Sequence, residues 1–214
     1  LYLSGFLMAL MNLYPSKING IANDGYNIKM LLKDKNSLEA TNKSLAIYGM
    51  AMQGYLYTEM AKELFKVDES YNYNNPLLAM QLQFKINYLI ESKEYKKAYE
   101  ILKDTLSSFD NILGHYQNIF LSDKLFFELI FNNPISKIRE DFKDLDKIII
   151  SSKTDLDTLK IKLAYYKLVE NDEIIFSEVL EKYYKELDKT EIKVDKLIGK
   201  EMLDLINNTK VKEG

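Results

Sequence analysis

The sequence predicts an all-α protein built of antiparallel helical hairpins that stack as a degenerate repeat domain. Two observations predict this class. The chain of 214 residues has three prolines and eight glycines, and so few turn-forming residues favour long helices over many short strands. Apolar residues also recur every three or four positions along several segments, which is the helical period. With 47% hydrophobic residues, the chain can bury a core of ordinary size.

The first segment, Leu1 to Tyr14, contains no charged residue. A transmembrane helix needs about 20 apolar residues, so this run is too short to cross a bilayer alone. Two interpretations remain open: the end of a transmembrane helix whose beginning was cut off, or a buried core helix. The initial Leu and the absence of charge before Lys17 favour the membrane helix. Further lysines follow at Lys29, Lys33 and Lys35. Beside a membrane helix, such a flank places the rest of the chain in the cytoplasm.

After a turn-rich stretch from Pro15 to Gly25, Tyr26 to Lys33 has a short helical pattern, and a long helix is expected next. Ser37 is its expected N-cap, and it runs toward Phe65. Its apolar positions have helical spacing: Leu45, Tyr48, Met52, Leu56, Met60 and Leu64. Gly49 and Gly54 lie inside this predicted helix. We expect both glycines to allow close packing against a neighbouring helix.

Two further stretches have the pattern of antiparallel helices joined by a tight turn. In the first, Pro76 suits the first position of a helix, and a break at Glu91 to Glu94 precedes a second helix. In the second, a break at Glu170 to Glu173 separates two apolar stripes. The stripes of the first hairpin are Leu78, Leu82, Ile86 and Leu89, then Tyr95, Ala98, Leu102, Leu106 and Phe109. Those of the second are Leu156, Leu159, Leu163 and Tyr166, then Phe176, Leu180, Tyr183 and Leu187.

Three more helices complete the prediction. An aromatic, strongly apolar helix covers Ile119 to Phe131, and an amphipathic helix covers Ser136 to Ile150. A last helix runs from Val194 to Ile206, and the polar residues after it are expected to fray.

The first hairpin resembles a tetratricopeptide unit, because Tyr95-x-x-Ala98-x-x-x-Leu102 matches the pattern of the second helix of that repeat. The resemblance is partial, since the usual Trp, the Gly pair and the closing Pro are missing. It implies a helical repeat-like domain whose concave face binds a protein or peptide partner.

Composition excludes several classes of function. The net charge is −3 and Arg139 is the single arginine, so the basic face of a nucleic-acid-binding protein is absent. Without cysteine, there is no disulfide, thiolate metal site or Cys nucleophile. One histidine, His115, cannot supply a two-His metal site, and we expect it to be a polar residue at a helix terminus. We therefore assign no catalytic residue to this chain.

One motif points to chemistry. Asn12-Leu13-Tyr14-Pro15 follows the apolar run, and Asn23-Asp24-Gly25 comes shortly after. This arrangement resembles the second motif of the site-2 protease family of intramembrane zinc metallopeptidases, in which an Asn-x-x-Pro element interrupts a membrane helix and an Asp-Gly follows. The spacing here is longer than usual, because residues 16–23 intervene. At the compact spacing the chain has Asn19-Gly20 instead.

The resemblance implies that Asp24 is a zinc ligand, that Gly25 shapes the turn, and that Asn12 and Pro15 frame the helix break. The zinc would be shared with the two His of an HExxH motif upstream of this chain. Two imidazoles and a carboxylate leave one position for water, and the Glu of HExxH acts as base. The alternative for Asp24 is a plain Asx-turn in which it caps a helix at Tyr26.

Three hypotheses of function follow. In the first, residues 1–35 are the end of a membrane helix with the Asp-Gly motif, and residues 36–214 are a soluble cytoplasmic docking or regulatory domain of a membrane-embedded zinc metalloprotease. Lacking HExxH, the chain cannot be active alone. In the second, the chain is a non-catalytic tetratricopeptide-like module for protein–protein interaction. In the third, the first helix is simply the anchor of a membrane-attached regulatory protein.

Overall fold

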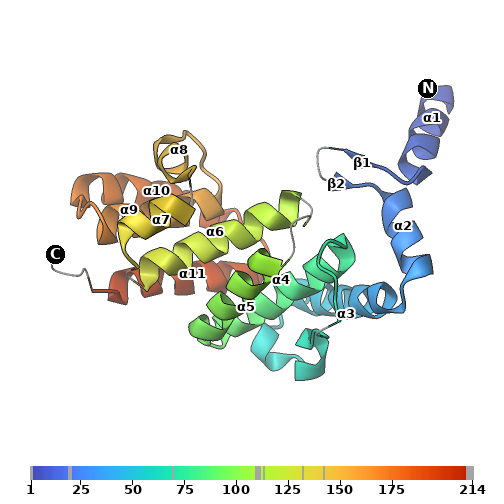
Figure 1. Cartoon of the computed structure of the whole chain (residues 1–214), viewed down its shortest axis with the longest axis horizontal. Helices are drawn as coiled ribbons and strands as arrows, with labels where there is room; N and C mark the ends of the chain where they lie inside the picture. Colours follow the sequence, from blue (N-terminus) through green and yellow to red (C-terminus); the bar gives the residue numbers. More distant parts are fainter. Residues whose placement is uncertain are drawn as a thin grey trace.

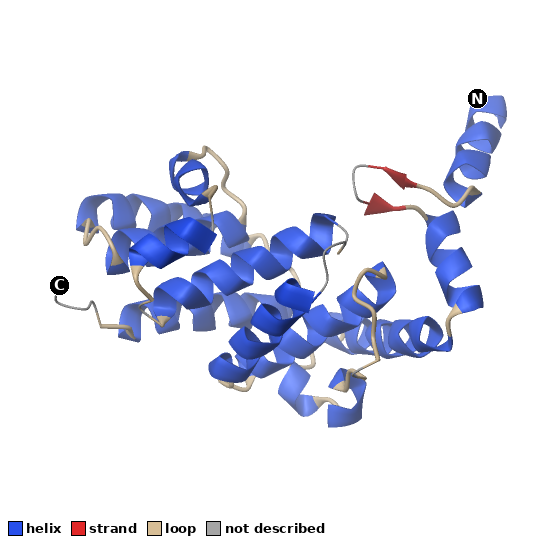
Figure 2. Cartoon of the chain, in the orientation of Figure 1, coloured by secondary structure: helices blue, strands red, loops and turns tan. Residues whose placement is uncertain are grey.

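A computed structural model of the chain describes residues 2–18, 21–68, 70–108, 112, 114–131, 133–141 and 143–210. These residues form an all-α fold of antiparallel helices, as predicted, with one short β-hairpin near the N-terminus (Figures 1 and 2). The termini lie at opposite ends of the molecule, with the first two helices at one edge and the packed helices forming the rest (Figure 1).

The N-terminal part consists of a helix, a hairpin and a second helix. Helix α1 spans Tyr2–Leu13, strands β1 and β2 span Lys17–Ile18 and Ile21–Ala22, and α2 spans Asp24–Lys33. Helix α1 packs on α2, which packs on α3. From Ser4 onward the side chains of α1 are exposed. Within the described part of the chain, no helix is both long enough and apolar enough to cross a membrane.

Helix α3, Lys35–Met52, differs from its prediction at both ends. Its N-cap is Asp34 and not Ser37, because the Asp34 carboxylate accepts from the backbone N–H groups of Asn36 and Ser37. The helix stops at Met52, since Gly54 takes a left-handed conformation at φ +90°. Two short 3₁₀ helices follow, η1 at Tyr57–Glu59 and η2 at Lys62–Phe65.

The inward face of α3 was also predicted wrongly. Leu45, Tyr48 and Met52 are exposed, whereas the face that packs on α4 and η2 is made of smaller residues. These are Ser37, Ala40, Ser44, Ile47 and Ala51. The close packing expected at Gly49 and Gly54 is not observed, because a Cβ at either position would meet nothing within 4 Å.

The first hairpin is confirmed as α4, Pro76–Glu91, and α5, Tyr95–Ser108. Pro76 is the first residue of α4, and the Asn75 side chain caps it by accepting from the N–H of Leu77. The turn closes by two bonds, Lys93 N–H to Ile90 O and Glu94 N–H to Leu89 O. This is the Schellman arrangement, and it holds Lys93 at φ 60°.

The middle of the chain contains α6, Gly114–Ile130, then α7, Ile135–Asp141, and α8, Leu145–Ile150. The aromatic helix is confirmed as α6, although it begins earlier than predicted. The single helix predicted for residues 136–150 is wrong, because the chain turns at Lys143 and Asp144. The break follows from packing, since α7 contacts α6 whereas α8 contacts α9.

The second hairpin is confirmed as α9, Leu156–Leu168, and α10, Glu173–Asp188. The last helix, α11, spans Lys193–Asn208 and returns along α9, α4 and α3. It therefore joins the two hairpins into one core. Large side chains that are fully buried in this core include Phe65, Phe120, Phe126, Phe127 and Tyr183.

Candidate functional site

The structure brings the predicted motif residues together. The Asn12 side-chain amide, at the end of α1, donates a hydrogen bond to Oδ2 of Asp24, the first residue of α2. The Asp24 side chain is exposed. Asp24 is not the helix cap, so the alternative role proposed for it from the sequence is wrong. The cap is Asn23, whose Oδ1 accepts from the N–H of Tyr26 at 3.0 Å.

Asn23 connects the helix, the hairpin and the second helix, and sequence reasoning missed this role. Its Oδ1 also accepts from the N–H of Ser16 at 3.0 Å. Its Nδ2 donates to Met11 O at 3.2 Å and to Tyr14 O at 2.7 Å. The Met11 and Tyr14 carbonyls lie at the end of α1, where they have no partner in the helix itself. One side chain therefore satisfies the end of α1 and the start of α2.

Gly25 is required at its position by close backbone contact. It is buried in the junction, and a Cβ there would lie 2.1 Å from Leu13 O, 2.5 Å from Leu13 C and 3.0 Å from Pro15 N. No real Cβ tolerates such distances to backbone atoms, so α1 and α2 can approach this closely with glycine alone. Asn12, Pro15 and Gly25 therefore lie close together where the end of α1 meets the start of α2.

The hairpin explains the long spacing of the motif. Lys17 pairs with Ala22 and Ile18 with Ile21 in antiparallel register, and the N–H of Asn23 donates to Ser16 O at 3.1 Å. The two ends of the hairpin therefore lie side by side, so the extra residues do not separate Asp24 from Asn12. Asn19-Gly20, the pair at the compact spacing, lies outside the described residues.

Asp24 alone does not make a metal centre. Among the described residues, no group of three His, Cys, Asp or Glu side chains could hold a metal ion. Asp24 could nevertheless serve as one ligand. Its carboxylate is exposed and one oxygen accepts from the Asn12 amide, and carboxylates that bind metal ions are usually hydrogen-bonded in this way. Zinc at Asp24 would need further ligands from outside this chain.

His115 is the second residue of α6, so the prediction of a helix-terminal position is confirmed. Its ring lies edge-on to Tyr116 with centroids 5.3 Å apart. It lines a cleft of about 650 Å³ between α6, α8 and α9, together with Leu125, Ile148, Asp157 and Ile161. The cleft mixes apolar walls with charges of both signs.

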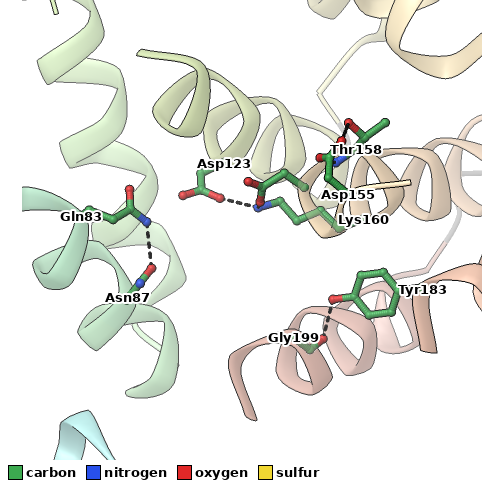
Figure 3. A network of polar contacts seen from close by, with 9 residues as sticks. Gln83, Asn87, Asp123, Asp155, Thr158, Lys160, Tyr183 and Gly199 are labelled. Atoms are coloured by element: carbon green, nitrogen blue, oxygen red, sulfur yellow. Dashed lines mark hydrogen bonds and ion pairs between the residues drawn. The ribbon is translucent and has the colours of Figure 1, made fainter. Parts of the chain in front are cut away.

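A buried ion cluster lies beside this cleft (Figure 3). The Lys160 ammonium lies 2.5 Å from Asp123 Oδ1 and 2.7 Å from Asp157 Oδ1. Lys160 and Asp123 are buried, whereas the Asp157 side chain is half exposed. Burial opposes the charge on Lys160, but the two carboxylates raise its pKa above the usual range. Burial raises the pKa of Asp123, and the ammonium opposes that change.

Sequence reasoning also missed this cluster, because Lys160 and Asp123 are more than thirty positions apart. Each lies in a helix with several other charged residues, so no local signal distinguished either one. Because the carboxylates and the ammonium satisfy one another, the cluster is best explained as a structural link between α6 and α9.

These observations define an all-α protein of antiparallel helices that carries a helix–hairpin–helix segment with an amide-held carboxylate. No protein-family model, no curated protein and no solved structure matches the chain.

Proposed function

We propose that this chain contributes Asp24 to the zinc site of an intramembrane metallopeptidase of the site-2 protease type. The observation that carries the proposal is the hydrogen bond from the Asn12 amide to Asp24 Oδ2. It joins the two halves of the motif despite their long separation. The two imidazoles and the general base would come from an HExxH helix outside this chain.

Each motif residue has a definite task in this proposal. Zinc held by two imidazoles and one carboxylate would supply the activated water for hydrolysis of a peptide bond. Asp24 would be the carboxylate ligand, and the hydrogen bond from the Asn12 amide would orient it. Asn23 fixes the backbone on which Asp24 stands, and Gly25 allows α1 to lie against it.

Helix α1 supports placement in a membrane domain. Its large exposed side chains are apolar and lie all round the helix, as with Phe6, Met8 at 73% exposure and Met11. A helix that is hydrophobic all round is normally buried in a protein core or a bilayer. The proposal therefore places α1 among membrane helices and the helical repeat-like domain from α3 onward on the cytoplasmic side, as a docking or regulatory domain.

The test is zinc content and peptide cleavage by the full-length gene product in membranes. Asp24→Asn removes the carboxylate with little change of shape. Asp34→Asn is a matched control, because it makes the same charge change at the next helix start and Asn still caps a helix. The proposal is supported if Asp24→Asn loses zinc and cleavage activity while Asp34→Asn keeps both. Unchanged zinc in Asp24→Asn, or no zinc in the unaltered protein, overturns it.

The second candidate function, a non-catalytic module that binds another protein, is favoured by the outer face of α3. Leu38, Leu45, Tyr48 and Met52 are exposed there at spacings of seven, three and four. This is the seam of a helix that packs against another helix, so the expected partner presents an apolar helix.

The seam is tested by a photo-crosslinking residue at Tyr48, with the exposed Ile150 of α8 as a control site. The function is supported if one protein crosslinks at residue 48 and not at residue 150, and if Leu45→Glu abolishes that crosslink. Equal crosslinking at both sites contradicts it.

A further inference from the structure

The N-terminal segment has four lysines, Lys17, Lys29, Lys33 and Lys35, which we call the lysine surface. All four side chains are exposed. Lys29 and Lys33 are one helical turn apart on α2, and the exposed Ile28 and Leu32 form the adjacent row. The helix therefore presents amines beside apolar side chains, with Leu32 at 82% exposure.

The acidic residues near this surface already have partners. Asp24 accepts from Asn12. Asp34 accepts from the N–H groups of Asn36 and Ser37 as the cap of α3. Glu39, the next acid along the chain, pairs with Lys43 at 2.8 Å. Up to residue 35 the sequence has four lysines and two aspartates, whereas the whole chain has a net charge of −3.

We propose that the lysine surface contacts the anionic headgroups of a lipid bilayer. The proposal rests on the proposed function in one respect, that α1 lies in the membrane. The argument is charge complementarity: positive charge is gathered beside an apolar helix in an otherwise acidic chain. Lysines next to a membrane helix are attracted by anionic lipids within about one Debye length of the surface.

The local structure suits this contact. The Lys17 ammonium lies over the Tyr26 ring, 4.6 Å from its centroid, which holds the β-hairpin lysine close to α2. Long lysine side chains can lay their stems along apolar surface while the amine reaches phosphate. Ile28 and Leu32 would then face the boundary of the acyl chains.

The experiment measures partition of the full chain into phosphatidylcholine vesicles with and without phosphatidylglycerol. The test variant is K17Q/K29Q/K33Q/K35Q. The matched control is K182Q/K185Q/K193Q/K200Q, which changes the same charge at exposed positions of α10 and α11. We expect the unaltered chain to bind the anionic vesicles more tightly than the neutral ones. The ratio of the two affinities should fall on the order of a hundredfold in the test variant and should be retained in the control variant.

Equal binding to both vesicle types, or an unchanged preference in the test variant, overturns the proposal and assigns the lysines to an acidic protein surface instead. The preference must also weaken as salt is added. Failure here is distinguishable from failure of the protease proposal, because vesicle preference is independent of zinc and zinc loss in Asp24→Asn is independent of the lysines.

Discussion

The side-chain amide of Asn12 is hydrogen-bonded to the carboxylate of Asp24, across the junction where α1 meets α2. Neither residue is placed by its own helix alone. Asn23 and Gly25, on either side of Asp24, set the distance between the two helices.

Gly25→Ala should open the junction, because the new Cβ would overlap Leu13 O. The hydrogen bond from the Tyr26 N–H to Asn23 should then form less often. We expect amide hydrogen exchange at Tyr26 to accelerate by about tenfold or more. Gly5→Ala is the control, since a Cβ there meets nothing within 4 Å. Unchanged exchange at Tyr26 in Gly25→Ala contradicts the prediction.

Asn23→Asp and Asn23→Ala should separate the two functions of the Asn23 amide. Asp retains the acceptor that caps α2 but loses the donor to Met11 O and Tyr14 O, whereas Ala loses both. A lost N-cap costs about 1 kcal/mol. Chemical-shift mapping should show α1 released in both variants and the start of α2 frayed in Asn23→Ala alone. Equal fraying in the two variants would refute this division.

Lys160→Met should lower the free energy of unfolding by about 3–5 kcal/mol, because it leaves the buried Asp123 carboxylate without its counter-charge. The double variant Asp123→Leu/Lys160→Met should recover much of this loss, since no unpaired buried charge remains. Denaturant titration measures both. A double variant as unstable as the single one would show that shape, and not charge, dominates at this site.

Alkaline pH should destabilise the fold. Burial raises the pKa of Tyr73, Tyr165 and Tyr183 to about 12, whereas an unfolded tyrosine ionises near pH 10. Between these values the unfolded state binds fewer protons, so stability is complete below about pH 10 and falls above it. The slope is about 1.4 kcal/mol per pH unit for each tyrosine.

Tyr183→Phe isolates one of these groups. It removes the hydrogen bond from the hydroxyl to Gly199 O (Figure 3), which costs about 1 kcal/mol at neutral pH. It should also make the fall of the unfolding free energy with pH less steep above about pH 10, by about 1.4 kcal/mol per pH unit. Parallel slopes for Tyr183→Phe and the parent chain would contradict the assignment.

Lys93→Gly should stabilise the protein by about 1 kcal/mol, because Lys93 occupies the left-handed conformation that closes the first hairpin. Thermal unfolding measures the gain. Lys97→Gly is the contrasting control, because Lys97 lies inside α5 and glycine there should cost about 1 kcal/mol. Destabilisation by Lys93→Gly would show that the lost ion pair of Lys93 with Glu201, 3.5 Å away, outweighs the relief of backbone strain.

The sequence predicted most helices, because their apolar stripes and turn residues are local signals. Pro76 marked the start of α4, and the breaks before α5 and α10 fell where the turns form. Errors arose where packing decides. The apolar stripe of α3 was predicted to face the core, but it faces outward. The face that packs on α4 and η2 is the one with Ala40, Ser44 and Ala51. The break between α7 and α8 likewise depends on two different neighbours.

The junction was predictable in part. Asn12, Pro15, Asp24 and Gly25 were singled out from the sequence, and they lie together in the structure, whereas zinc binding by Asp24 stays a prediction. Asn23 was not assigned a role, because its role depends on carbonyls of Met11 and Tyr14 that become neighbours after folding. The Asp123–Lys160 pair was missed for the same reason, as its partners are distant in sequence.

The hairpin between Ser16 and Asn23 also bears on how such motifs are recognised. Its two ends are held together by the bond from the Asn23 N–H to Ser16 O, so residues can be added beyond that bond without moving Asp24. Lengthening a closed loop costs little free energy. A search pattern that fixes the number of residues between Pro15 and Asp24 would therefore pass over chains with the same junction. A pattern that lets this gap vary, and requires Asn before Asp-Gly, would retain them.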